Sequence, residues 1–199
     1  MRDKWYGDQR DLVKWSVLLI PSEKYKAVKI IQVAYYRKDE WDKTTINIDG
    51  EECAIPDSVI RHFRNVDRIQ TIATTPTIEI VKDVFANRDG YNNNIVANLN
   101  RIGPERHIIF LDPDTGLEPV HPNHNHVLEL ELRDIWDAIK IGDVLVFYQH
   151  QTNRNGTDWI EPKRKQFERA IRLKTGRVKV AKGNMIARDV VFFFIQKTA

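Results

Sequence analysis

The 199-residue sequence contains little cysteine and no long hydrophobic segment. Its single cysteine, Cys53, has no second cysteine with which to form an internal disulfide, as is usual in proteins of reducing compartments. No run of apolar residues approaches the ~20 residues that cross a bilayer, and the first residues contain no apolar segment of a signal peptide. We therefore expect a cytoplasmic protein with no membrane partner.

Three common catalytic and nucleotide-binding motifs are also absent from the sequence. It has no G-x-x-x-x-G-K-[ST], which excludes a P-loop, and no G-x-S-x-G, which excludes the usual nucleophile elbow. No G-x-G-x-x-G follows the first expected strand, so dinucleotide binding of the usual kind is not expected. The candidate site must therefore come from other residues.

The excess of positive charge is small, with 31 Lys and Arg against 28 Asp and Glu. A net charge of +3 permits nucleic-acid binding without requiring it, because dedicated binders have a denser basic surface. The basic residues gather late in the chain, at Lys163, Arg164, Lys165, Arg169, Arg172, Lys174, Arg177, Lys179 and Lys182. This group indicates either a solvated helix face followed by a hairpin or a surface that faces phosphates.

Helix-like and strand-like segments alternate along the chain. Helices are expected at 8–20, 57–68, 95–101, 130–140 and 162–173, and strands at 28–36, 77–86, 108–111, 144–148, 177–181 and 189–196. The runs at 108–111 and 144–148 are apolar throughout, as in parallel strands that are buried on both faces. The pattern predicts one α/β domain over residues 1–199, with a mostly parallel sheet, helices on both faces and a C-terminal antiparallel hairpin.

Turn-forming residues set the expected boundaries of these elements. Asp8 is expected to cap the first helix and Pro21 to end it, because proline removes a helical hydrogen bond. The polar segment 87–94 is expected to be a loop, and residues 182–184 are expected to be a turn between the last two strands. A further small hairpin is expected around Asp49-Gly50.

Two groups of polar residues follow the two most apolar strands. Asp112-Pro113-Asp114 follows strand 108–111, and Gln149 and His150 follow strand 144–148. Because ligands bind at the carboxyl ends of the strands in open α/β sheets, we expect these side chains to line one cleft. A carboxylate beside an imidazole allows general acid–base catalysis or metal binding. The alternative is that the two aspartates only form a turn.

Residues 7–15 read G-D-Q-R-D-L-V-K-W, and residues 112–115 read D-P-D-T. The first segment is similar to the motif G-N-F-A-D-V-L-K-H of the large-subunit ribosomal-RNA adenine-N6 methyltransferases, with Gly7, Asp11 and Lys14 at the same spacing. The second stands where those enzymes have D-P-P and an aromatic residue. The order of elements resembles class I methyltransferases and, more distantly, the three-cysteine-motif partner proteins.

The resemblance implies a Rossmann-like methyltransferase fold that binds S-adenosylmethionine across the strand ends. It implies a cofactor-binding group in the first motif, formed by Gly7, Asp11, Lys14 and Trp15. It also implies that Asp112 holds the amine of an adenine base, which must then be unpaired or flipped out of a duplex. The sequence departs from the family at Asp114 and Thr115, and no glycine turn follows the first strand.

Three functions agree with these features. The first is S-adenosylmethionine-dependent methyl transfer to nucleic acid, with a catalytic group of Asp112, Pro113, Asp114 and His150. The second is a nuclease or phosphodiesterase in which Asp112, Asp114 and Glu118 hold Mg²⁺ or Mn²⁺, because neighbouring acids suit a hard divalent cation. His150 is a further candidate for this reaction. The third is a catalytically silent module that binds a nucleotide or a protein partner in the cleft.

Overall fold

The computed structural model describes residues 7–37, 45–63, 66–153, 158–183 and 186–199. Its helices are α1 (Gln9–Tyr25), α2 (Asp57–Phe63), the 3-10 helix η3 (Val66–Thr71), α3 (Arg88–Arg101), α4 (Glu129–Ala138) and α5 (Ile160–Ala170). Its strands are β1 (Lys29–Val33), β2 (Thr45–Ile48), β3 (Glu51–Ala54), β4 (Thr77–Val81), β5 (His107–Leu111), β6 (Gly116–Leu117), β7 (His126–Val127), β8 (Val144–His150), β9 (Lys179–Gly183) and β10 (Ala187–Gln196). None of the described helices is long and apolar enough to cross a membrane.

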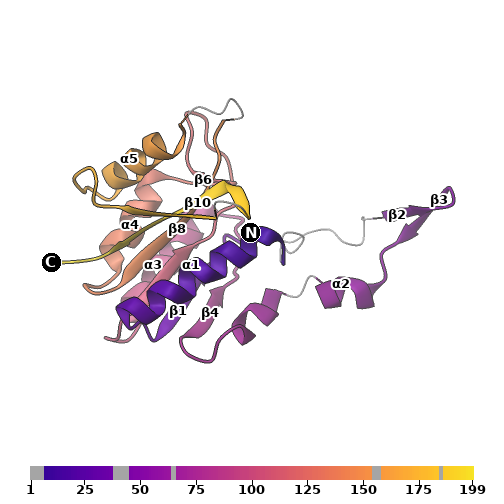
Figure 1. Ribbon diagram of the computed structural model, residues 1–199, viewed down its shortest axis with the longest axis horizontal. Coiled ribbons are helices and arrows are strands. Elements are labelled where there is room, and N and C mark those ends of the chain that lie inside the picture. The colour runs from indigo at the N-terminus through magenta and orange to yellow at the C-terminus, as the bar shows by residue number, and fades with distance from the viewer. Residues whose placement is uncertain (1–6, 38–44, 64–65, 154–157, 184–185) are drawn as a thin grey trace.

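Six strands form the central sheet, in the order β4-β1-β5-β8-β10-β9 (Figure 1). The strands β4, β1, β5 and β8 run parallel to one another, whereas β10 runs antiparallel to both β8 and β9. The last strand in the chain therefore lies between two strands that precede it. The predicted mostly parallel sheet with a C-terminal antiparallel hairpin is confirmed.

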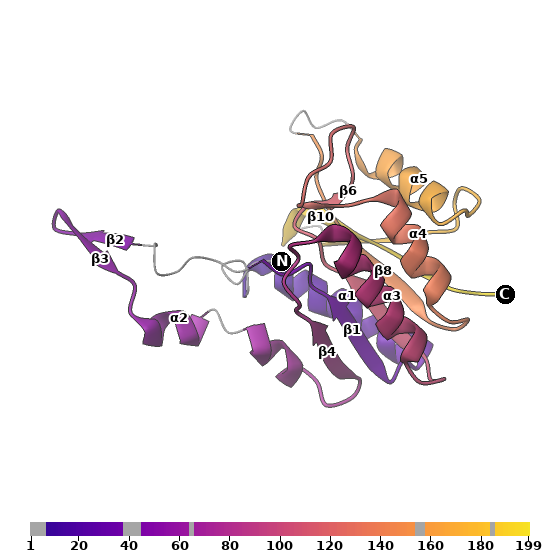
Figure 2. The same cartoon turned by 180° about the vertical axis from the view of Figure 1, so that it is seen from behind.

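Helices cover both faces of this sheet. Apolar residues of α3, α4 and α5 pack on one face, and apolar residues of α1 and η3 pack on the other. Figure 2 shows the first of these layers, with α3 and α4 in front of the strands. The central strand between the two layers is fully buried, since Ile108, Ile109, Phe110 and Leu111 of β5 each have 0% of their surface exposed. The predicted α/β class, with helices on both faces, is confirmed.

β2, β3 and α2, which lie between β1 and β4 in the chain, form an arm that extends away from the sheet (Figure 1). β2 and β3 pair in antiparallel fashion within this arm, and Asp49 and Gly50 connect them. Both turn residues have positive φ angles, 56° and 94°, as the tightest hairpin turns require. The expected hairpin is therefore confirmed, and its side chains are exposed except that of the half-buried Cys53.

The first helix continues through Pro21 to Tyr25, so the predicted end at Pro21 is wrong. Proline removes one hydrogen bond from a helix, but Pro21 and Ser22 are both buried and their packing outweighs that loss. The helix is capped instead by Lys26, whose left-handed conformation lets its N–H reach the carbonyls of the last turn. Burial of the helix face decides its length here.

The predicted loop at 87–94 is also wrong, because α3 begins at Arg88. The side chain of Asn87 caps this helix by accepting a hydrogen bond from the N–H of Gly90 at 3.4 Å. Tyr91, Ile95 and Leu99 stand four residues apart and face the core. The run of asparagines between Tyr91 and Ile95 hides this helical period in the sequence.

Three further boundaries differ from the expected ones. The helix expected at 57–68 ends at Phe63, and η3 begins at Val66. The strand expected at 77–86 ends at Val81. β9 continues to Gly183, which was expected to lie in a turn, whereas Asn184 lies outside the described residues.

We expect Phe167→Ala to lower the free energy of unfolding by about 3–5 kcal/mol, measured by urea denaturation. The Phe167 side chain is fully buried, and its ring lies 5.6 Å from that of Phe147 and 5.7 Å from that of Phe193. Leu130→Ala on α4 is the control, because Leu130 is 64% exposed and its loss should change stability by at most about 0.5 kcal/mol. Equal effects of the two changes would contradict this assignment of the core.

Candidate functional site

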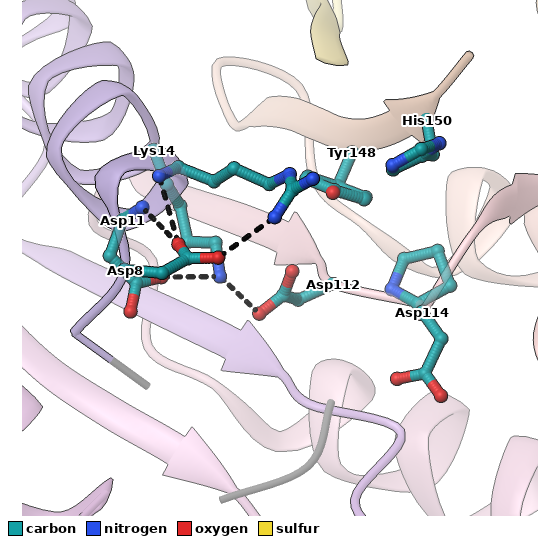
Figure 3. A pocket seen from close by; sticks show the side chains of 9 residues that line it. Asp8, Asp11, Lys14, Asp112, Asp114, Tyr148 and His150 are labelled. Carbon is teal, nitrogen blue, oxygen red and sulfur yellow. Dashed lines mark hydrogen bonds and ion pairs between the residues drawn. The ribbon is translucent and has the colours of Figure 1, made fainter. Parts of the chain in front are cut away.

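A cavity of about 260 Å³ opens at the carboxyl ends of β5 and β8, beside the start of α1 (Figure 3). Its lining residues come from three segments that are far apart in the sequence: Asp8, Arg10, Asp11, Lys14, Asp112, Pro113, Asp114, Tyr148 and His150. All four residues proposed as a catalytic group from the sequence therefore meet at this cavity. Asp11 and Lys14 of the first motif join them there.

Gly7 and Trp15, the other two residues of the proposed cofactor-binding group, do not line this cavity. The N–H of Gly7 donates a hydrogen bond to Oδ2 of Asp11 at 2.6 Å, so this residue helps to fix the start of α1. Trp15 has only 6% of its surface exposed and packs in the core between α1 and the sheet. The first motif therefore contributes its four charged side chains to the site, while Trp15 packs in the core.

The Asp112 side chain is held in a fixed position at the end of β5. Its Oδ2 accepts hydrogen bonds from Nζ of Lys14 at 3.0 Å and from Nε2 of Gln32 at 2.7 Å. Its backbone N–H donates to the carbonyl of Val33, and Pro113 then ends the strand because it has no N–H. Asp112 is 3% exposed, so this carboxylate is presented to the cavity from within the protein.

Lys14 joins two carboxylates across the site. Its Nζ lies 2.8 Å from Oδ1 of Asp11, in addition to its contact with Asp112 (Figure 3). Burial by itself would lower the pKa of Lys14, but the two carboxylates outweigh burial and raise that pKa above its ordinary value. Lys14 is therefore a permanent cation that neutralises part of the acidic lining.

Tyr148 forms a neutral wall of the same cavity. Burial raises the pKa of its hydroxyl, and the nearby Lys14 only partly opposes this effect. The hydroxyl therefore keeps its proton and can donate it in a hydrogen bond. The Nζ of Lys14 lies 5.8 Å from the centre of the Tyr148 ring, where a cation attracts the face of the ring.

A second ionic group lies beside His150 and involves the last strand. Arg10 binds Asp189 through two of its nitrogens and binds Asp8 through a third, at 3.0 Å. The Nε2 of His150 lies 3.1 Å from Oδ2 of Asp189. Burial raises the pKa of the Asp189 carboxyl, but the hydrogen bond from Arg10 outweighs burial and holds that pKa below its ordinary value.

The surroundings of His150 bear on its role as a proposed general base. Its Nε2 faces the Asp189 carboxylate, and its Nδ1 lies 3.2 Å from the carbonyl oxygen of Gln151. Both partners are hydrogen-bond acceptors. The two ring nitrogens of His150 are therefore directed at acceptors within the protein.

The acids proposed as metal ligands each have another partner. Asp112 binds Lys14, Asp114 forms an ion pair with Arg37, and Oε1 of Glu118 accepts the N–H of Glu129 at 2.7 Å. Across the part of the chain that the structure describes, no group of three or more His, Cys, Asp or Glu side chains is arranged to hold a metal ion. Glu118 thus acts at the start of α4, where its charge suits the helix dipole.

Sequence reasoning missed Arg10, Gln32, Tyr148 and Asp189 as members of the site. Gln32 had a visible signal, because it is the one polar residue inside the apolar stretch 30–36. Asp189 had a less direct signal: an antiparallel last strand starts at the edge where the parallel strands end, so its first residues join the site. Arg10 and Tyr148 had no signal beyond their closeness in sequence to Asp11 and His150.

No protein-family model matches this chain, and neither do any curated proteins or solved structures with which it was compared.

We expect Lys14→Met to lower the free energy of unfolding by about 3–5 kcal/mol, because it leaves two neighbouring carboxylates without their cation. Both ends of the Lys14–Asp112 pair are buried, with 8% and 4% of the side chains exposed. The matched control is Lys29→Met, which breaks the exposed pair with Glu79 and should cost at most about 1 kcal/mol. Similar costs for the two variants in urea denaturation would show that Lys14 does not hold the site together.

We also expect the stabilising effect of Asp189 to depend on pH. Its pKa is lower in the folded chain than the ordinary value near 4, so its contribution is present above about pH 4 and is lost as the pH falls through the folded-state pKa. Since the side chain is 34% exposed, Asp189→Asn should cost no more than about 1 kcal/mol at pH 7. Urea denaturation at pH 7, 5 and 3 measures this difference, which should shrink at pH 3.

The control for this pH series is Asp57→Asn on α2, whose side chain is 83% exposed. We expect no measurable change in stability at any of the three pH values, because an exposed i,i+4 pair contributes little. A cost of Asp189→Asn that stays constant from pH 7 to pH 3 would contradict the charge-based account.

Proposed function

We propose that the protein is a methyltransferase of the class I type, which uses S-adenosylmethionine to methylate an amine, most simply the exocyclic amine of a nucleic-acid base. The single observation that carries this proposal is the Asp112 carboxylate, fixed by Lys14 and Gln32 at the end of the central strand and facing a cavity. The strand order supports it, since the resemblance to class I methyltransferases implies a parallel sheet completed by an antiparallel hairpin.

The chemistry of an aromatic amine explains the need for a fixed carboxylate. Its nitrogen lone pair is delocalised into the base ring, so the amine is a weak nucleophile. A carboxylate oxygen that accepts an N–H bond holds the amine in one orientation and increases the electron density on its nitrogen. Asp112 suits this role because Lys14 and Gln32 limit the positions that its side chain can adopt.

The lining of the cavity contains carboxylates and an aromatic ring that suit the two cationic groups of the cofactor. S-adenosylmethionine carries an ammonium and a sulfonium, and it supplies an electrophilic methyl group when it is bound. Asp8 and Asp11 at the start of α1 would hold these cations in addition to their pairs with Arg10 and Lys14, and the Tyr148 ring offers a flat wall. Lys14 neutralises Asp112, so that the acidic residues do not repel one another strongly.

The end of β1 differs from the family and limits where the cofactor could bind. Tyr35 has a φ angle of 45°, and its N–H donates to the Tyr91 hydroxyl at 2.9 Å. The rings of Tyr35, Phe85 and Tyr91 lie 4.9–5.4 Å apart and pack in the space after this strand. We therefore assign the cofactor to the α1 side of the sheet edge, next to Asp11.

Hydrolysis at a divalent metal is the weaker proposal for the same cavity. The acids that would bind Mg²⁺ or Mn²⁺ are held by Lys14, by Arg37 and by the start of α4. A metal ion would have to displace these partners. A hard cation also binds best to several carboxylates that converge on one point.

The test is thermal unfolding of the protein with S-adenosylmethionine, S-adenosylhomocysteine, Mg²⁺ or Mn²⁺. A ligand at 100 times its dissociation constant adds about 2.7 kcal/mol to the free energy of unfolding, which raises the melting temperature by several degrees. We expect this shift with both methionine-derived compounds. A shift with the metal ions alone would favour hydrolysis, and no shift with any compound would leave a binding module without this chemistry.

Methyl transfer from radiolabelled S-adenosylmethionine to single-stranded oligonucleotides then tests Asp112. We expect Asp112→Asn to lower the rate by about 100-fold or more, because an amide cannot replace a charged acceptor. Glu79→Gln on β4 is the control, since its exposed carboxylate lies outside the residues that line the cavity. A wild-type rate of methyl transfer by the Asp112→Asn variant would contradict the proposed role of this residue.

A further inference from the structure

A second cavity, of about 680 Å³, lies at the opposite edge of the sheet. It is lined by the end of α1, by the segment between α5 and β9, and by the chain after β10. Because Gln196 pairs with Val144 at the start of β8, this is the edge where the parallel strands begin. The cavity is therefore separate from the site around Asp112.

The charged side chains that line this cavity all have the same sign. They are Lys24, Arg172, Lys174, Arg177, Lys179 and Lys197. No aspartate or glutamate is among the described residues of the lining. Like charges around one concave surface repel one another, so a bound anion would lower the electrostatic repulsion among these side chains.

One of these six cations already has a structural role. The Nζ of Lys197 donates to the carbonyls of Trp136, Asp137 and Ile139 at 2.7–3.1 Å, which satisfies the end of α4. The carbonyl of Ala170 at the end of α5 is likewise satisfied, by Arg133. These carbonyls at the ends of α4 and α5 already have donors. The remaining cations around the cavity are therefore not explained by a capping role.

The other five cations are exposed: Lys24, Arg172, Lys174, Arg177 and Lys179. Within the described parts of the chain, none of these five forms an ion pair. By contrast, Arg164 and Arg169 on α5 pair with Glu161 and Glu129. The late basic cluster of the sequence thus includes two paired arginines on α5 and a group without ion pairs around the cavity.

We propose that this cavity binds a free polyphosphate anion, such as the triphosphate group of a nucleotide. Two arginines and three lysines are enough to balance the three to four negative charges of a triphosphate, and arginine is suited to paired hydrogen bonds with phosphate oxygens. The volume lies within the ~300–1,000 Å³ of sites that enclose ligands of this size. A phosphodiester strand would instead need a track longer than one cavity of this size.

Part of the wall suits the uncharged portion of a nucleotide. The half-buried Tyr25 has Lys24 5.8 Å from its ring centre, and its hydroxyl lies 3.3 Å from Nζ of Lys179. Leu173 and Ile195 add apolar surface nearby. A base or sugar could lie against this wall while the phosphates face the cations. This proposal does not depend on the methyltransferase proposal, because the two cavities share no residue.

The test is isothermal titration of the full chain with sodium tripolyphosphate, which has no adenosine that could enter the other cavity. We expect saturable binding at one site per chain, which weakens as the salt concentration rises. Adenosine triphosphate without added metal should bind at the same site, and more tightly if Tyr25 contacts the nucleoside. The variant Tyr25→Ala should then remove that difference while leaving tripolyphosphate binding unchanged.

Two triple variants with the same change in net charge separate a site from a general charge effect. Arg172→Glu, Lys174→Glu and Arg177→Glu together should weaken tripolyphosphate binding by at least about tenfold. Arg68→Glu, Lys165→Glu and Lys182→Glu together change exposed cations outside this cavity and should weaken binding by less than about threefold. Melting temperatures of both variants report whether each one is folded.

Three results would overturn the proposal. The first is no saturable binding of tripolyphosphate to the folded wild-type protein. The second is equal weakening in both triple variants, which would show only a general effect of net charge. The third is tight binding of a single-stranded oligonucleotide with no binding of tripolyphosphate, which would identify the surface as a nucleic-acid track.

Discussion

The buried ion pair between Lys14 and Asp112 joins the first helix to the end of the central strand. The two residues are 98 positions apart in the chain, so this contact forms only when α1 lies correctly on the sheet. Charges without partners are costly inside a protein, and the pair is therefore sensitive to geometry. The same contact that fixes α1 also fixes the carboxylate that faces the cavity.

The two cavities at opposite edges of the sheet differ in how the charges around them are arranged. At the carboxyl edge, acids and bases alternate and each cation has an acidic partner, as in Arg10 with Asp189 and Lys14 with Asp11. At the amino edge, exposed cations such as Arg172 and Lys174 gather without acids among the described lining residues. The small net charge of +3 does not reveal this separation, because it sums the charges of the whole chain.

The sequence predicts the parts of the fold that depend on long apolar runs. β5 and β8 were found because every residue of their cores is apolar, and Asp112 and His150 followed from the rule that ligands bind at the strand ends. Local rules failed where burial opposed them, as at Pro21, which packs inside α1. A capping rule applied to Asn87 would have found the start of α3.

Partners that come from distant segments are harder to predict from the sequence. Asp189 joins Arg10 and His150 only because β10 runs antiparallel to β8, and no local pattern gives the register of that pairing. Gln32 is the opposite case, since a polar side chain in a buried strand must find a polar partner. A search for isolated polar residues within apolar strands would have identified it.

The position of β10 also links the edge of the sheet to the cavity. Among the described strands, β9 is an edge strand whose only neighbour is β10, which follows it in the chain. β9 therefore joins this sheet only through β10, which itself pairs with β8. Asp189 belongs to β10, so the strand that attaches β9 to the sheet also completes the ionic group beside His150.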